Sequence, residues 1–257
     1  MVKGLYTAYT GMINEQHRMD TLTNNLANST TVGFKKEGST SQSFDTVLAY
    51  KVKDTSENVN IPKRIGINTP GVKIGENYTD YSQGSFKITD NTYDLALSGD
   101  GFFTIEFTNK AGETSTKYTR DGSFTLTTDG YLVTKDGDYV MGTNGRIQLD
   151  PNVDASIDSQ GRIMQNDTLV ATLQITDFTD YDYLEKYGEN LLNAVEGATT
   201  TTANAKVYSG YLEMSNVNIV SEMVDLITIT RQYEANQKII KSIDETLDIA
   251  ANQIGRV

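Results

Sequence analysis

The sequence predicts an α+β protein in which helices at the two ends of the chain pair as a coiled-coil-like stem around an antiparallel, all-β middle. Near both ends, apolar residues recur every seven positions. Such a repeat keeps one stripe of a helix against a neighbouring helix. Between the ends, short apolar runs are separated by Asp-Gly and Asn-Gly pairs, which are typical of hairpin turns.

The first segment, residues 1–30, is an N-terminal assembly helix, with helical periodicity over residues 3–27. Gly4 and Gly11 each weaken a helix by roughly 1 kcal/mol relative to Ala, so this helix needs a packing partner. It is expected to end where asparagine side chains compete for backbone hydrogen bonds, at 24–28. The positions assigned to the assembly contact are Leu5, Met12, Met19, Leu22 and Leu26.

Residues 31–70 are rich in Ser, Thr, Asn and Gly and have little to bury, which predicts a linker or adaptor. Residues 71–210 are predicted to form a β-rich outer domain. Within it, residues 177–192 are expected to form a short helix or a loop excursion, and residues 198–205 a surface loop. The expected strands are 102–107, 118–124, 131–134 and 139–141.

Residues 211–257 are the C-terminal assembly segment, with a helix over 218–254. Asn218 suits the N-cap, Glu222 and Asp225 suit the positive end of the helix dipole, and Gly255-Arg256 provides a stop. Packing between chains is favoured over a helical hairpin within one chain. Asn236 is a polar position beside the stripe, of the kind that fixes register. The stripe residues are Ile219, Leu226, Tyr233, Ile240, Leu247 and Ile254.

Composition argues against several classes of protein. The net charge is −12 with no run of Lys or Arg, so nucleic acid is not an expected partner. The chain has no Cys, hence no disulfide and no thiolate metal site. No stretch approaches the ~18 consecutive apolar residues of a membrane span, and the N-terminus lacks the apolar core of a secretory signal. Direct membrane insertion is therefore not expected.

No catalytic, cofactor-binding or metal-binding residue is predicted. His17 is the only histidine, and one His without Cys makes a zinc site improbable. The carboxylates of the middle segment have two interpretations: a glycosidase pair or calcium loop, or ordinary turn chemistry. Turn chemistry is favoured because Asp before Gly is usual in tight hairpins. These carboxylates are Asp100, Asp121, Asp129, Asp136 and Asp138.

Four motifs, in order along the chain, resemble those of the bacterial flagellar rod and hook proteins of the axial family. Residues 94–103 resemble the motif that opens the family's middle domain, and residues 118–124 resemble its next hairpins. Val32 stands where the family usually has Thr. The terminal signatures fall on Asn24, Asn25, Leu26, Ala27 and Asn28, then Gly33, Phe34 and Lys35, and on Ser215, Asn216, Val217 and Asn218.

The resemblance implies a structural subunit of the flagellar basal-body rod. Its terminal helices would line an inner tube, with the β domain outside. Implied partners are further copies of the chain, adjacent rod and hook subunits, and the type III export apparatus. The likeness favours a distal rod subunit, with a proximal rod or hook-type subunit as the alternative. A glycan-active envelope enzyme with helical tethers is a more distant one.

Overall fold

The computed structural model describes residues 2–51, 63–110, 112–188 and 190–254, which fall into two compact units. The helical unit comprises Met1–Leu26, Glu37–Thr79 and Asn218–Val257; the β unit comprises Ala27–Lys36 and Asp80–Val217. A helix near each end and an all-antiparallel β middle give the expected α+β class. No helix in the described ranges is long and apolar enough to cross a membrane.

The two long helices of the helical unit are α1 (Val2–Ala27) and α2 (Ile219–Ile249), with a π-helical turn at Ala250–Ile254. Both predicted helices are confirmed to within a few residues. Asn218 caps α2, since its side chain accepts hydrogen bonds from the backbone N–H groups of Val220 and Ser221 at 3.1 and 3.3 Å. The predicted stop at Gly255-Arg256 lies outside the described residues.

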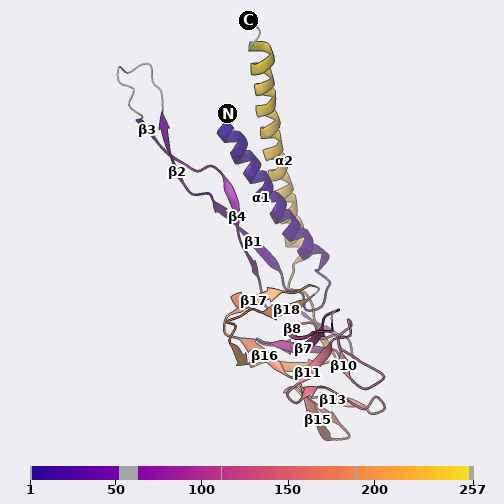
Figure 1. Cartoon of the computed structure of the whole chain (residues 1–257). Helices are drawn as coiled ribbons and strands as arrows, with labels where there is room; N and C mark the ends of the chain where they lie inside the picture. The colour runs from indigo at the N-terminus through magenta and orange to yellow at the C-terminus, as the bar shows by residue number, and fades with distance from the viewer. Residues whose placement is uncertain (1, 52–62, 111, 189, 255–257) are drawn as a thin grey trace. The chain divides into compact units, whose positions relative to one another are not determined.

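Within the helical unit, α1 and α2 run antiparallel beside each other (Figure 1). The Gly4 Cα faces Ile243, Gly11 faces Asn236, and Asn25 reaches Glu222. From each of these contacts to the next, the residues are one heptad and then two heptads apart on both helices. Two helices that both carry a seven-residue repeat should pair in this way. Continuous coiled-coil pairing along the stem stays a prediction.

The interval predicted as a linker contains strands. β1 (Glu37–Ser43) pairs with β4 (Val72–Thr79), and β2 (Val47–Lys51) pairs with β3 (Lys63–Asn68), so residues 37–51 and 63–79 form a two-stranded ribbon in the helical unit. These strands were not predicted, and the role of the interval as a linker or adaptor stays a prediction. Strand pairing satisfies backbone N–H and C=O groups whether or not the side chains are apolar. Because these strands contain few apolar residues, the sequence pattern did not predict them. The predicted division of the chain into four segments stays a prediction. The boundaries of the two compact units fall at other positions.

The β unit contains a ten-stranded antiparallel sheet, whose central path runs β17-β18-β8-β7-β11-β10-β9 within the described residues. β16 and β12 join this path at β7 and β11, and β19 pairs with β16. Smaller pairings are β5–β21, β6–β20 and β13-β14-β15. The strands are β5 (Phe86–Ile88), β6 (Leu95–Ser98), β7 (Phe102–Thr108), β8 (Thr114–Thr119), β9 (Thr125–Leu126), β10 (Leu132–Val133), β11 (Tyr139–Gly142), β12 (Gly145–Arg146), β13 (Ala155–Ile157), β14 (Arg162–Gln165), β15 (Thr168–Thr172), β16 (Ile175–Phe178), β17 (Leu184–Lys186), β18 (Leu191–Ala194), β19 (Thr200–Thr202), β20 (Lys206–Ser209) and β21 (Tyr211–Glu213).

The hairpin signals mark turns, and the strands expected at 102–107, 131–134 and 139–141 are present as β7, β10 and β11. At Asp136-Gly137 the backbone N–H of Gly137 donates to Thr134 O at 3.1 Å, and the φ of Gly137 is +94°, which favours glycine. The strand expected over 118–124 is shorter, because β8 ends at Thr119 and the chain turns there.

Two other expectations in the β unit are wrong. Residues 177–192 hold the end of β16, a single 3₁₀ turn at Tyr181–Tyr183, β17 and the start of β18. The predicted surface loop contains β19, which pairs with β16. Its threonines are β-branched, which suits an exposed edge strand that buries nothing.

Two apolar clusters form the core of the β unit. In the larger, the rings of Phe103 and Phe124 meet edge to face at 5.1 Å, and Leu95 and Leu97 are fully buried. The smaller is built on Phe102, Phe178 and Leu192. Burying one such side chain contributes about 1.5–3 kcal/mol, so strands with short or polar sequences are held by this core.

Candidate assembly interface

The predicted stripe of α1 lies on one half-buried side of the helix. Its five members are each partly buried, and Ala8, on the same face, is buried with 5% of its surface exposed. Their assignment to an assembly contact stays a prediction. The residues concerned are Leu5, Met12, Met19, Leu22 and Leu26.

The predicted stripe of α2 is only partly covered in the single chain. Leu226, Tyr233 and Ile240 are half-buried, whereas Ile219 and Leu247 are each 40% exposed. Of Ile254 only the backbone is described. The most buried apolar residue on this helix is instead Ile229, at 2% exposure.

The polar position Asn236 lies against Gly11 of α1. A Cβ at Gly11 would stand 3.1 Å from the Asn236 Nδ2, which is tighter than side chains normally pack. The glycine that weakens α1 by propensity therefore makes room for an amide on α2. A seam polar residue of this kind fixes register at some cost in stability.

Asn25 joins α1 to the ribbon. Its Nδ2 donates to Glu37 O at 2.8 Å, and its Oδ1 accepts from Glu37 N at 2.9 Å, so the side chain mimics a strand neighbour. The same Nδ2 lies 3.4 Å from the Glu222 Oε2 on α2, and both side chains are buried. This one motif residue therefore holds three elements of the helical unit together.

Gly33 and Phe34, from the N-terminal motif, lie in the β unit. Gly33 has φ +69°, and a Cβ there would stand 2.5 Å from Asp121 N, so only glycine fits without a shift of the backbone. Phe34 is buried, and the Lys186 Nζ lies 4.4 Å from its ring centre. This cation–π contact anchors the motif on β17.

Glu213 is a buried carboxylate of the β unit that lies between two cations. The Lys35 Nζ donates to its Oε1 at 2.7 Å, and the Arg120 Nη1 donates to its Oε2 at 3.2 Å. All three side chains are at least nine-tenths buried. Burial lowers the pKa of Lys35, and the charge and hydrogen bond of Glu213 oppose that effect. Breaking such a group by removing one partner leaves buried charge and is costly.

Asn216 ties together the chain segments at this edge of the β unit. Its Oδ1 accepts from Lys36 N at 2.8 Å, and its Nδ2 donates to Asp80 O at 2.8 Å. Ser215 is buried, and its hydroxyl accepts from Val217 N at 3.3 Å. The N- and C-terminal motifs, nearly two hundred residues apart in sequence, thus meet through backbone hydrogen bonds to one amide.

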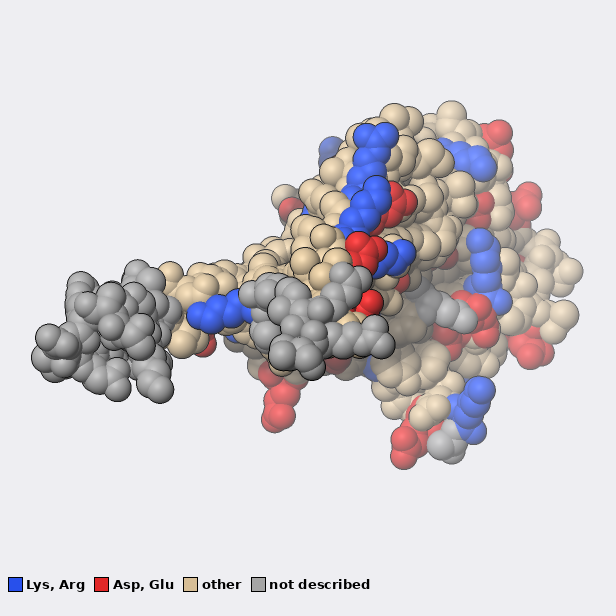
Figure 2. All heavy atoms as spheres, turned by 90° about the horizontal axis from the view of Figure 1, so that it is seen from above, with Lys and Arg blue, Asp and Glu red and all other residues tan. Residues whose placement is uncertain are grey.

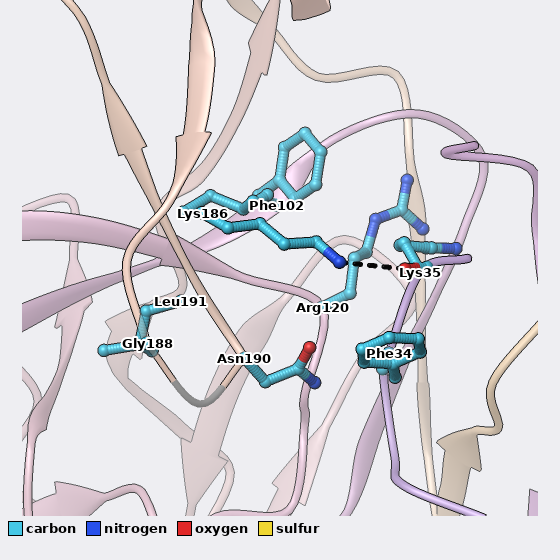
Figure 3. A pocket seen from close by; sticks show the side chains of 10 residues that line it. Phe34, Lys35, Phe102, Arg120, Lys186, Gly188, Asn190 and Leu191 are labelled. Carbon is cyan, nitrogen blue, oxygen red and sulfur yellow. Dashed lines mark hydrogen bonds between the residues drawn. The ribbon is translucent and has the colours of Figure 1, made fainter. Parts of the chain in front are cut away.

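A cavity of about 20 Å³ lies among these residues (Figure 3). In the figure Lys186 extends across it, donating from Nζ to Lys35 O at 3.1 Å, with Asn190 and Phe34 below. Asn190 in turn donates to Val32 O at 2.6 Å. Such a volume holds about one water molecule.

The five middle aspartates lie in or next to turns and bends. Asp121 accepts from Ser123 N at 2.9 Å, and Asp138 supplies the carbonyl that closes the turn at Thr134. No group of three or more potential metal ligands occurs among the described residues. His17 is half-buried on α1. On the face drawn in Figure 2, basic and acidic side chains of the described residues are interspersed over a mostly uncharged surface.

Sequence reasoning missed Glu213 and Arg120, which form the buried ion group with Lys35. A signal existed for Glu213, because an acidic residue follows two apolar ones at the end of a strand, two positions before a motif serine. Arg120 lay inside a motif that was noted only as a hairpin. Which charges pair across the fold is not visible in the sequence.

The comparisons with known proteins agree with this arrangement. A model described as "Flagella basal body rod protein" matches residues 5–35, which run from α1 through Lys35. One described as "Flagellar hook protein FlgE/F/G D1 domain" matches residues 96–165. One described as "Flagellar basal body rod FlgEFG protein C-terminal" matches residues 208–254, which include Glu213, Asn216 and α2.

Three relatives named flagellar basal-body rod protein FlgG are similar over nearly their whole length. That of Bacillus subtilis (strain 168) is 34% identical, covering 98% of this chain and 99% of the relative. That of Caulobacter vibrioides is 33% identical, covering 96% and 97%. That of Buchnera aphidicola subsp. Schizaphis graminum is 32% identical, covering 96% and 98%.

Two long terminal helices, an antiparallel β unit and these matches together indicate a structural protein of the flagellar axis. The chain belongs to the family of flagellar basal-body rod proteins. It is a structural subunit of the rod, and its place is the flagellar basal body, which spans the cell envelope.

Proposed function

We propose that this subunit belongs to the distal part of the rod and assembles with copies of itself into a helical polymer. The observation that carries the proposal is similarity, over almost the whole chain, to rod proteins that share one name. The alternatives are a proximal rod subunit and a hook-type subunit. They share the terminal signatures, so the choice depends on position in the basal body.

The stripes of the two helices supply the proposed assembly contact. Ile219 and Leu247 are substantially exposed in the single chain, and Leu226, Tyr233 and Ile240 keep part of their surface accessible. Covering that surface in a polymer would add apolar burial that the single chain lacks. The same stripe residues would then contribute to contacts within and between subunits.

The further proposed partners are the adjacent rod and hook subunits and the flagellar type III export apparatus. Export in an unfolded state suits a chain without cysteine, because no disulfide must form after transfer. Lack of catalysis is likewise a proposal. It is supported by the relatives, which are named as rod proteins, and by the Asp121 carboxylate, which accepts a hydrogen bond within a turn.

The test is electron microscopy of basal bodies from a strain that lacks this chain. A distal rod subunit predicts basal bodies with a proximal rod and no distal rod or hook, restored by the wild-type gene. A particle that lacks the whole rod would favour the proximal alternative. A full rod without a hook would favour a hook-type subunit, and intact flagella would refute the proposal.

A further inference from the structure

The last two strands of the β unit lie in residues 206–217, which we name the completing segment. It contains β20 and β21, whereas the strands of the ten-stranded sheet, as the structure describes it, all end at or before Thr202. By its position in the sequence, the large sheet could therefore form without the completing segment. Three sets of contacts oppose that order of folding.

The first set joins β20 to a strand that has no access to solvent. Leu95, Ala96 and Leu97 of β6 each have 0% of their surface exposed, and among the described strands β6 pairs with β20 alone. Val207 of β20 belongs to the same apolar cluster, and its backbone N–H donates to Ser159 O at 3.0 Å. Without β20, the backbone of β6 would lose its partners or the core would open to water, and both are unfavourable.

The second set joins β21 to the two stretches of the β unit that precede the large sheet in the sequence. β21 pairs with β5, and the Met214 N–H donates to Ser85 O at 2.8 Å. The Gly33 N–H of the N-terminal motif donates to Glu213 O at 2.7 Å. The completing segment therefore holds both earlier stretches in place through backbone hydrogen bonds.

The third set consists of charges. The ion pairs described for the buried Lys35 and Arg120 are both with Glu213, at 2.7 and 3.2 Å. The Glu213 Oε1 also accepts from the Gly84 N–H at 2.9 Å. If the rest of the β unit folded first, it would have to bury two cations without this carboxylate. Burial of charge without its partner is strongly unfavourable, so the earlier segments should not pack before Glu213 arrives.

We propose that the completing segment controls the folding of the β unit, which stays unfolded until this segment is in place and then folds in one cooperative step. Synthesis starts at the N-terminus, so the completing segment is made after all other parts of the β unit. The folding order does not depend on the rod function proposed above. Its use does: a chain that is exported unfolded would remain transferable until its synthesis has passed residue 217.

A cut just before the completing segment tests this order, starting from the full chain. A protease recognition sequence is inserted after Asn204, which is exposed in the loop between β19 and β20, and the folded chain is cut there. The two parts are separated in urea. The N-terminal part, with isotope-labelled leucine methyl groups, is returned to buffer alone or together with the unlabelled C-terminal part. The uncut chain with the same insertion, refolded from urea, is the control.

The N-terminal part alone should show neither the native methyl signals of Leu95 and Leu97 nor a cooperative melting transition. Addition of the C-terminal part should restore both to the values of the uncut control. Native signals or cooperative melting of the N-terminal part alone would overturn the proposal. A mixture in which the native signals do not return, although the uncut control refolds, would overturn it as well.

The affinity between the two parts tests the role of the buried charges. Glu213→Gln in the C-terminal part should weaken binding at least about tenfold, because Lys35 and Arg120 then stay buried without a counter-charge. Glu245→Gln, exposed on α2, is the matched control and should change binding less than about twofold. The α1–α2 contact contributes equally to both variants. Equal binding by the two would contradict the part assigned to Glu213, and neither result bears on assembly of the rod.

Discussion

Glu213 holds two buried cations, Lys35 and Arg120, at 2.7 and 3.2 Å. Glu213 is the last residue of β21, two positions before the C-terminal signature, and Lys35 ends the N-terminal motif, so their contact brings the two terminal signatures close together on the β unit. Net stabilisation from such a buried group is small, because desolvation offsets attraction. Its value is specificity: other arrangements of these segments would leave charge buried without a partner.

Glu213→Gln keeps the shape of the side chain and removes its charge. We expect a loss of about 3–5 kcal/mol in the free energy of unfolding of the β unit, because Lys35 and Arg120 stay buried without a counter-charge. Urea denaturation followed by tyrosine circular dichroism measures the loss. The matched control is Glu106→Gln, at the more exposed pair with Arg146, where the change should be too small to resolve. Equal stability of the two variants would show that the buried pair has no such role.

Gly33→Ala tests the backbone of the motif. Both the positive φ and a collision of Cβ with Asp121 N oppose alanine, so we expect a loss of about 2–4 kcal/mol in unfolding free energy. Gly137→Ala has a positive φ but open space around it and should lose roughly 1 kcal/mol. The difference between the two unfolding free energies isolates the collision. If Gly33→Ala is no worse than the control, the contact with Asp121 yields easily.

At the scale of elements, the helices and the sheet differ in what supports them. The strands around Leu95, Phe103 and Val140 enclose side chains with no exposed surface. α2 has many exposed residues in the single chain, among them several large apolar ones. Helices gain most of their stability from packing, so α1 and α2 depend on neighbours far more than the β unit does.

Hydrogen exchange of a verified monomer should reflect that difference. Residues 1–30 and 218–257 should exchange fast, and residues 95–145 should exchange slowly, because local opening is easiest where few apolar groups are buried. In the assembled polymer the helices should become protected. Comparable protection of all three regions in the monomer would mean that the α1–α2 seam alone stabilises the stem.

Elements whose signals come from residues close together in the sequence were predicted, and elements that depend on a distant partner were not. Asn218 as a cap and Asp136-Gly137 as a turn are local chemistry, and both were predicted correctly. β1 and β19 were missed, because a polar strand exists only through its partner and its own residues carry no apolar alternation. The polar stretch after α1 likewise carries no alternation of apolar residues that would have predicted β1 to β4.

At the scale of the whole molecule, we expect the stripes to form contacts of the assembled rod. Ile240→Asp places a carboxylate in the seam, where burying an unpaired charge costs several kcal/mol in every subunit of a polymer. We expect an exported, soluble chain whose β unit melts normally but which forms no completed rod and no hook. Motility, electron microscopy of basal bodies and melting of the purified chain measure these three outcomes.

Glu245→Gln is the control for that substitution, since Glu245 is exposed on α2 and off the stripe. It should leave motility and assembly nearly unchanged. Normal filaments in Ile240→Asp cells would remove the seam from the assembly contact. Global unfolding of the Ile240→Asp monomer would instead make the seam part of an ordinary folded core.

The sequence by itself determined the class of the protein, both helices and the turns of the sheet, because periodicity, capping and turn chemistry act between residues a few positions apart. Only the tertiary structure decided that Gly11 makes room for Asn236, that Asn25 joins α1 to the ribbon, and that Lys35 pairs with Glu213. It also decided which apolar residues of the helices remain exposed. Each of these contacts joins segments that are up to about two hundred residues apart in the sequence. The free energies of burial and ion pairing depend on those contacts, and no local sequence pattern encodes them.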